Sequence, residues 1–209
     1  MTGLSIPNSI STIGTSLLEG CENLVSITIP DSVTTISEKS FNNCNSLLSL
    51  ALPDSLTTIG TNAFANCESL MSVRYGSNSL TGLNSTSKIF ENSGAGSGVE
   101  LTISANINKI PDYAFDGLKI KTIKFEGAAC REFGTDAFAN NDTNETMEVY
   151  ITDVDAWIQS AFANKNATPL SAGGKLYENG NEITECTVNY DIGDYVFYGC
   201  ESIEKVTVD

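Results

Sequence analysis

The sequence contains no histidine, which removes the commonest general base, the commonest metal ligand and the usual partner of a serine or cysteine nucleophile. No apolar run approaches the roughly 20 residues that are needed to cross a bilayer. The opening segment, MTGLSIPNS, has no basic stretch followed by an apolar one, so it does not read as a secretory signal. Basic residues are also scarce, with 11 Lys and Arg against 26 Asp and Glu and a formal net charge of −15. Such a surface repels phosphate backbones and anionic membranes, so we expect no nucleic-acid partner and no membrane insertion.

The sequence does contain a repeat with a period of 23 residues, whose units begin at Met1, Leu24 and Leu47. In each unit an apolar-x-apolar triplet is followed by Pro, then by Ser, Ile, an aromatic residue or Leu, and finally Cys. Looser copies continue to the end, so the chain holds about nine units. The last residues, IEKVTVD, begin another unit, and we therefore expect the chain to be part of a longer protein.

The repeat predicts one coil of a solenoid. The triplet Ile27–Ile29 has the period of two that indicates a strand, and Pro30 ends it because proline cannot donate to a ladder. Phe41 and Cys44 lie three residues apart, which suits a short helical or 3₁₀ turn that returns the chain. A coil this short cannot bury its own apolar face, so stability comes from stacking on neighbouring coils. We predict that residues 1–209 form a single β-rich α/β solenoid, a right-handed superhelix with a parallel sheet on its concave face.

One segment, residues 152–185, interrupts the repeat. DVDAWIQSAFAN has helical character, with Asp153 or Asp155 as its cap, and the side chains expected on one face are Val154, Trp157, Ile158 and Phe162. The sequence KLYENGNEIT predicts a hairpin around its Asn-Gly pair. We expect an irregular elaboration, helix plus hairpin, on the solenoid.

The units Leu24–Cys44 and Leu47–Cys67 fit the pattern LxxIxIPxSVTxIGxxAFxxC, which resembles the BspA-type, or Treponema-pallidum-type, leucine-rich repeat. The segment IGDYVFYGCESIEKVTV carries the second half of that pattern, and DxxAW followed by LYxNG resembles a variant unit of bacterial members. The resemblance implies a leucine-rich-repeat solenoid. It also implies a surface or secreted protein of a host-associated bacterium or mucosal protist, with a role in adhesion.

The cysteines admit three interpretations. Cys21, Cys44, Cys67 and Cys200 hold the same position in their units, whereas Cys130 and Cys186 fall elsewhere, Cys186 on a strand. Stacked small interior residues are the favoured interpretation. Disulfides are disfavoured because side chains on adjacent coils point in parallel, and a metal site is disfavoured because the chain lacks both a CxxC pair and histidine. We expect six free thiols, no metal and no cofactor.

A binding surface is predicted where strand side chains face outward. The middle residue of each triplet, together with the residue two before it, forms a strip rich in Ser and Thr, with Arg, Lys and Tyr near its centre. Thr and Ser are ordinary residues for a solvated strand, yet Arg and Tyr are favoured in protein interfaces. The candidate binding residues are Thr28, Ser49, Arg74, Thr102, Thr122, Lys124, Tyr150 and Thr187.

Three functions remain open. The favoured one is a non-enzymatic recognition module at the cell surface or secreted, adhesin-like, which binds a host matrix protein, a cell-surface protein or a glycan. The second is a structural spacer or scaffold, and the third an accessory region of a carbohydrate-active or other surface enzyme. No catalytic residue is assigned. The Asn-x-Ser/Thr pattern of N-glycosylation occurs at Asn84, Asn141, Asn144 and Asn166.

Overall fold

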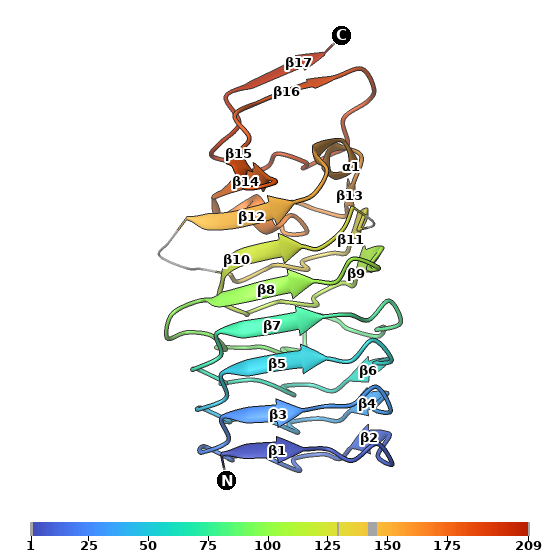
Figure 1. Cartoon of the computed structure of the whole chain (residues 1–209), viewed down its shortest axis with the longest axis vertical. Coiled ribbons are helices and arrows are strands. Elements are labelled where there is room, and N and C mark those ends of the chain that lie inside the picture. Colours follow the sequence, from blue (N-terminus) through green and yellow to red (C-terminus); the bar gives the residue numbers. More distant parts are fainter. Residues whose placement is uncertain (1, 129, 142–145, 209) are drawn as a thin grey trace.

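The computed structural model describes residues 2–128, 130–141 and 146–208. It is a solenoid of stacked coils, with the N-terminal coil at one end and the C-terminal coil at the other (Figure 1). The main sheet has nine strands and runs along most of the stack. In spatial order they are β1 (Gly3–Ser5), β3 (Ser26–Thr28), β5 (Ser49–Leu52), β7 (Ser72–Tyr75), β8 (Val99–Ile103), β10 (Ile120–Phe125), β12 (Met147–Ile151), β14 (Gly174–Glu178) and β15 (Asn181–Glu182).

The register of the main sheet follows the sequence repeat. Ser26 pairs with Ser49 and Ser49 with Ser72, so one coil equals one 23-residue unit in this part of the chain. The strands from β1 to β14 pair in parallel, and β15 pairs antiparallel to β14. The predicted solenoid with a parallel sheet is therefore confirmed.

Two short sheets lie on another side of the stack. One contains β2 (Thr12–Ile13), β4 (Thr35–Ile36) and β6 (Thr58–Ile59), and the other contains β9 (Lys109–Ile110), β11 (Glu132–Phe133) and β13 (Ala161–Phe162). Between them, in the fourth coil, a side chain takes over the pairing. Asn78 Nδ2 donates to the Asn106 carbonyl at 2.7 Å, and its Oδ1 accepts from the Asn108 amide at 3.0 Å.

The return segments are built from tight turns, not from the short helical turns expected. The Ser40 amide donates to the Ser37 carbonyl at 3.4 Å, and Lys39, the third residue of that turn, has φ of 54°. Alternate amides point to the next coil instead, as when the Phe41 amide donates to the Ala63 carbonyl at 2.8 Å. These bonds tie neighbouring coils together outside the sheets, and they satisfy backbone groups that a buried segment cannot leave unpaired.

The core is a stack of aliphatic and aromatic rows. Val33, Ile36, Phe41 and Cys44 are each 0% exposed, and the burial of Cys44 agrees with the interior position predicted for the repeated cysteines. Phenylalanine rings from successive coils stack on one another, with centroid distances of 4.9 Å for Phe41–Phe64, 5.6 Å for Phe64–Phe90, 6.3 Å for Phe90–Phe115 and 5.5 Å for Phe115–Phe138. The apolar side chains of each coil thus pack directly against those of the next coil.

The cysteine position of the repeat is a buried hydrogen-bonding position. The Cys44 thiol lies 3.3 Å from the Leu18 carbonyl, and the Cys67 thiol 3.4 Å from the Phe41 carbonyl, in each case on the preceding coil. In the fourth coil Ser93 takes this place and donates to the Phe64 carbonyl at 2.6 Å. In these three coils the position therefore holds a small side chain with a donor, whereas Leu118 and Asn141 occupy it in the next two coils.

All six cysteines are free. Cys44, Cys67 and Cys130 are buried, whereas Cys21, Cys186 and Cys200 are partly exposed. Burial in an apolar surrounding disfavours the thiolate. It raises the pKa of Cys44 to about 11 and the pKa values of Cys67 and Cys130 to about 12.

The segment from 152 to 185 contributes to the stack and also decorates it. Asp153 caps helix α1 (Val154–Ile158), and its Oδ1 accepts from the Ala156 amide at 2.9 Å. The helix is shorter than expected, because Phe162 lies on β13 and not on the helical face. A 3₁₀ helix, η1 (Pro169–Ala172), follows.

The predicted hairpin forms at the edge of the main sheet. Tyr177 pairs with Glu182 across an Asn-Gly turn in which both central residues, Asn179 and Gly180, have positive φ. Beyond it, β16 (Glu185–Val188) and β17 (Lys205–Val208) form a separate parallel pair. Within the described ranges no helix is long and apolar enough to span a bilayer.

Candidate binding surface

The outward side chains of the main sheet form two columns that run along the solenoid, and we call them together the sheet face. Cross-strand register defines both columns, and none of their residues is buried. The first column is Gly3, Ser26, Ser49, Ser72, Glu100, Thr122, Glu148 and Lys175. The second column is Ser5, Thr28, Ala51, Arg74, Thr102, Lys124, Tyr150 and Tyr177.

Seven of the eight predicted binding residues lie on the sheet face. They are Thr28, Ser49, Arg74, Thr102, Thr122, Lys124 and Tyr150. The eighth, Thr187, is on β16, where it pairs with Thr207 in the separate two-stranded sheet. The place expected for it is taken by Tyr177 on β14. The alternation Lys175-Leu176-Tyr177, with a buried central leucine, was the signal that could have identified this strand.

The cations of the sheet face are held in ion pairs. Arg74 Nη2 lies 3.0 Å from Glu126 Oε2, and Arg74 Nη1 also donates to Ser104 Oγ. Lys124 Nζ lies 2.6 Å from Glu100 Oε2. Each of these four charged side chains remains 44–47% exposed. Exposed pairs contribute little to stability, at most about 1 kcal/mol each, but they fix the position of both charges.

A pair of tyrosines stands at the C-terminal end of the sheet face. The rings of Tyr150 and Tyr177 stack with centroids 4.8 Å apart and planes inclined by 17°. Tyr150 donates from its hydroxyl to Glu148 Oε2 at 3.2 Å, and Lys175 Nζ lies 3.0 Å from Glu182 Oε1. Partial desolvation raises the pKa of both phenols, with the nearby glutamates acting in the same direction. The hydrogen bond to Glu182 raises the pKa of Lys175.

The sheet face differs sharply in charge from the whole molecule. The charged residues of the two columns, Arg74, Lys124, Lys175, Glu100 and Glu148, sum to +1, and the neighbouring Glu126 and Glu182 bring this to −1, against −15 for the chain. Alanine at position 51 is the single aliphatic side chain in the two columns. The surface is therefore polar and almost neutral, with hydroxyls in its N-terminal half and paired charges and tyrosines in its C-terminal half.

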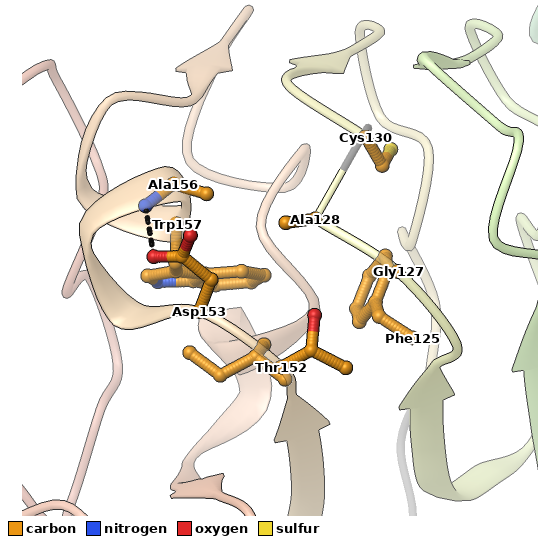
Figure 2. A pocket seen from close by; sticks show the side chains of 9 residues that line it. Phe125, Gly127, Ala128, Cys130, Thr152, Asp153, Ala156 and Trp157 are labelled. Carbon is orange, nitrogen blue, oxygen red and sulfur yellow. Dashed lines mark hydrogen bonds between the residues drawn. The ribbon is translucent and has the colours of Figure 1, made fainter.

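A small cavity lies beside helix α1 (Figure 2). Asp153, Ala156 and Trp157 line one side of it, and Phe125 and Cys130 are among the residues on the other. Figure 2 shows the Asp153 carboxylate turned to the Ala156 amide, so it serves as the helix cap and is not directed at a ligand. The volume of about 10 Å³ holds one water molecule at most, far below the several hundred Å³ of a typical ligand site.

The family of the chain follows from comparison with known repeats. A family model described as BspA type leucine-rich repeat region matches residues 1–95 and 86–209, in six copies. The chain belongs to the BspA-type leucine-rich repeat family.

This BspA-type chain is similar to two solved structures. One is a leucine-rich cell surface protein from Faecalibacterium prausnitzii A2-165, at 16% identity and a TM-score of 0.38, with 100% of this chain and 60% of that chain covered. The other is a leucine-rich repeat protein from Bacteroides ovatus ATCC 8483, at 22% identity and a TM-score of 0.39, with 100% and 61% covered. The chain thus spans about three fifths of the length of each structure. Among curated proteins, none matches it.

The BspA-type coils are alike inside and different outside. Inward strand positions repeat as Leu50, Val73, Leu101, Ile123 and Val149, all at most 2% exposed. The outward positions are small or hydroxyl-bearing on β1 to β5, whereas on β7 to β14 charged and aromatic residues join Ser72, Thr102 and Thr122. Packing against neighbouring coils fixes the inward residues. The outward residues are not fixed in this way, so they are free to determine what the surface binds.

Other candidate sites are accounted for by packing. In the part of the chain that the structure describes, no three His, Cys, Asp or Glu side chains gather where they could hold a metal ion. Among the N-glycosylation patterns, Asn84 is exposed, whereas Asn141 is 3% exposed and its Oδ1 accepts from the Ile120 amide at 2.5 Å. Asn166 donates to Asp136 Oδ1 at 2.9 Å, and Asn144 lies outside the described residues.

Proposed function

We propose that this BspA-type solenoid is a non-enzymatic recognition module at the cell surface or in a secreted protein. It binds a host matrix protein, a cell-surface protein or a glycan through the sheet face, in the manner of an adhesin. Membership of the family supports the location and the adhesive role, since members are typically surface or secreted proteins. The observation that carries the proposal is a continuous, exposed sheet whose outward side chains differ from coil to coil while the inward ones repeat.

The charged centre of the sheet face gives the first test. Arg74→Glu with Lys124→Glu replaces two ion pairs by like charges opposite Glu126 and Glu100. The matched control is Lys39→Glu with Lys109→Glu, which changes the net charge equally at two exposed pairs away from the sheet face. The first double variant should weaken binding by about tenfold or more, which corresponds to about 1.4 kcal/mol, and the control should not.

Binding is measured by surface plasmon resonance on immobilised collagen, fibronectin and mucin, and by adhesion of protein-coated beads to epithelial cells. Equal affinity of the wild type and the sheet-face variant would exclude this surface as the site. If residues 1–209 alone bind none of these targets, but a longer protein that contains them does bind, the result would favour the spacer function.

A further inference from the structure

The composition of the sheet face discriminates between a protein partner and a glycan partner. A protein interface is built around a buried apolar core, whereas the two columns of the sheet face contain one aliphatic side chain, Ala51. They offer instead hydroxyls, carboxylates, amines and two stacked tyrosines. Sugar units present hydroxyls that both donate and accept hydrogen bonds, and C–H faces that pack against aromatic rings. The surface therefore matches a polyhydroxylated ligand more closely than a protein.

The charges point to a neutral sugar chain. Together with Glu126 and Glu182 beside it, the sheet face carries a net charge of −1, and its cations are already paired with carboxylates, as in Lys124–Glu100 and Lys175–Glu182. An acidic glycan would have to displace these carboxylates, and a basic ligand would have to displace the cations. A neutral hydroxyl can accept from the amine and donate to the carboxylate of the same pair without separating them.

The spacing of the strands indicates how such a chain would lie. Neighbouring strands are about 4.8 Å apart, which is close to the length of one sugar unit in an extended hexopyranose chain. Lys124, Tyr150 and Tyr177 stand in register on three successive strands, β10, β12 and β14. A chain that runs along the solenoid axis would therefore meet one polar or aromatic side chain per sugar unit.

We infer that the C-terminal half of the sheet face, from β10 to β14, is a binding site for a neutral, extended hexopyranose chain. This deepens the proposed function, on which it rests, by naming the ligand class and the strands that bind it. Tyr150 and Tyr177 form its centre, and the pairs Lys124–Glu100 and Lys175–Glu182 flank them. The stack occupies one face of each ring and holds both hydroxyls in fixed positions, so little side-chain freedom is lost when a sugar binds.

The test uses the full chain with cellohexaose and mannohexaose as neutral probes, titrated by isothermal calorimetry at physiological salt. Tyr150→Ala with Tyr177→Ala should lower the affinity at least about tenfold. Tyr150→Phe with Tyr177→Phe keeps the stack and removes the hydroxyls, so it should give a smaller loss. Tyr195→Ala with Tyr198→Ala is the matched control, because those tyrosines are 42% and 44% exposed and lie off the sheet face. Circular dichroism and the fluorescence of the single tryptophan check that each variant is folded.

The outcomes separate this inference from the proposed function. Absence of binding to both neutral hexasaccharides at millimolar concentration, or binding to heparin alone, overturns it. Loss of fibronectin or collagen binding in the Tyr150→Ala, Tyr177→Ala variant, without competition by either hexasaccharide, assigns the site to a protein partner. In that case the recognition function stands and the glycan assignment fails.

Discussion

Ser93 stands in the position that cysteine occupies in the first three coils, and replacing it tests how that position is held. The side chain is 0% exposed. Its Oγ donates to the Phe64 carbonyl at 2.6 Å and accepts from the Cys67 amide at 3.1 Å. Ser93→Ala removes both bonds. A typical hydrogen bond contributes about 1 kcal/mol, and an unsatisfied buried group costs about 1–3 kcal/mol, so we expect a loss of about 2–3 kcal/mol in the free energy of unfolding.

Ser93→Cys is the matched variant. The thiols of Cys44 and Cys67 approach carbonyls of the preceding coil at 3.3 and 3.4 Å, so a cysteine at position 93 can do the same. We expect it to cost about 1 kcal/mol or less, because a weaker donor remains and no cavity forms. Ser69→Ala, at an exposed serine of the neighbouring coil, should change stability by less than about 0.5 kcal/mol.

Urea unfolding followed by circular dichroism measures these differences. Because cooperativity can fail along a solenoid, amide exchange of the peptide around Cys67 supplies a local measurement. A Ser93→Ala protein within about 0.5 kcal/mol of the wild type would refute the reasoning, since that is the range of an ordinary surface substitution. If Ser93→Ala and Ser93→Cys lower the free energy of unfolding equally, side-chain volume, and not the hydrogen-bond donor, sets the requirement at this position.

Further predictions concern the helix cap, the thiols and glycosylation. Asp153→Ala should lower stability by about 1 kcal/mol in urea unfolding, whereas Asp153→Asn, which keeps the cap, should not. At pH 7.5 in native buffer, iodoacetamide should label the three partly exposed cysteines and leave the three buried ones unlabelled until urea is added. Folding raises the thiol pKa of Cys67 from 9.0 to about 12. The stabilisation linked to this shift is therefore fully present below pH 9 and is lost as the pH rises toward 12. Urea unfolding at a series of pH values measures this loss. In a eukaryotic secretory host, mass spectrometry should find glycan at Asn84 and none at Asn141.

The repeat made the core predictable because its period places the same residue in the same environment coil after coil. Cys44 and Cys67 were assigned to the interior on this ground, and both are 0% exposed. The turns of the return segments were harder to predict from the sequence. Lys39 adopts a positive φ, which nothing in a lysine favours, because the hydrogen bonds to the next coil fix its backbone.

The sheet face was only partly predictable. Outward positions follow from strand alternation, so Arg74 and Lys124 could be placed, but their partners could not. Glu126 is 52 residues from Arg74 and comes within 3.0 Å only because β7 and β10 lie two strands apart. Tyr177 was missed because its strand continues directly into a hairpin, which hides the repeat in the sequence.

The gap between the two short sheets has a mechanical consequence. On the main-sheet side, β7 and β8 pair without interruption. On the other side β6 and β9 belong to different sheets, and the side chains of Asn78 and Lys88 bond to the following coil. A rod that is bonded continuously along one side and weakly along the other has its lowest flexural stiffness at that level. Bending there would leave the main-sheet bonds intact and change the angle between the hydroxyl-bearing half of the sheet face and its tyrosine-bearing half. The fourth coil would then act as a hinge that lets one rigid surface follow the contour of another.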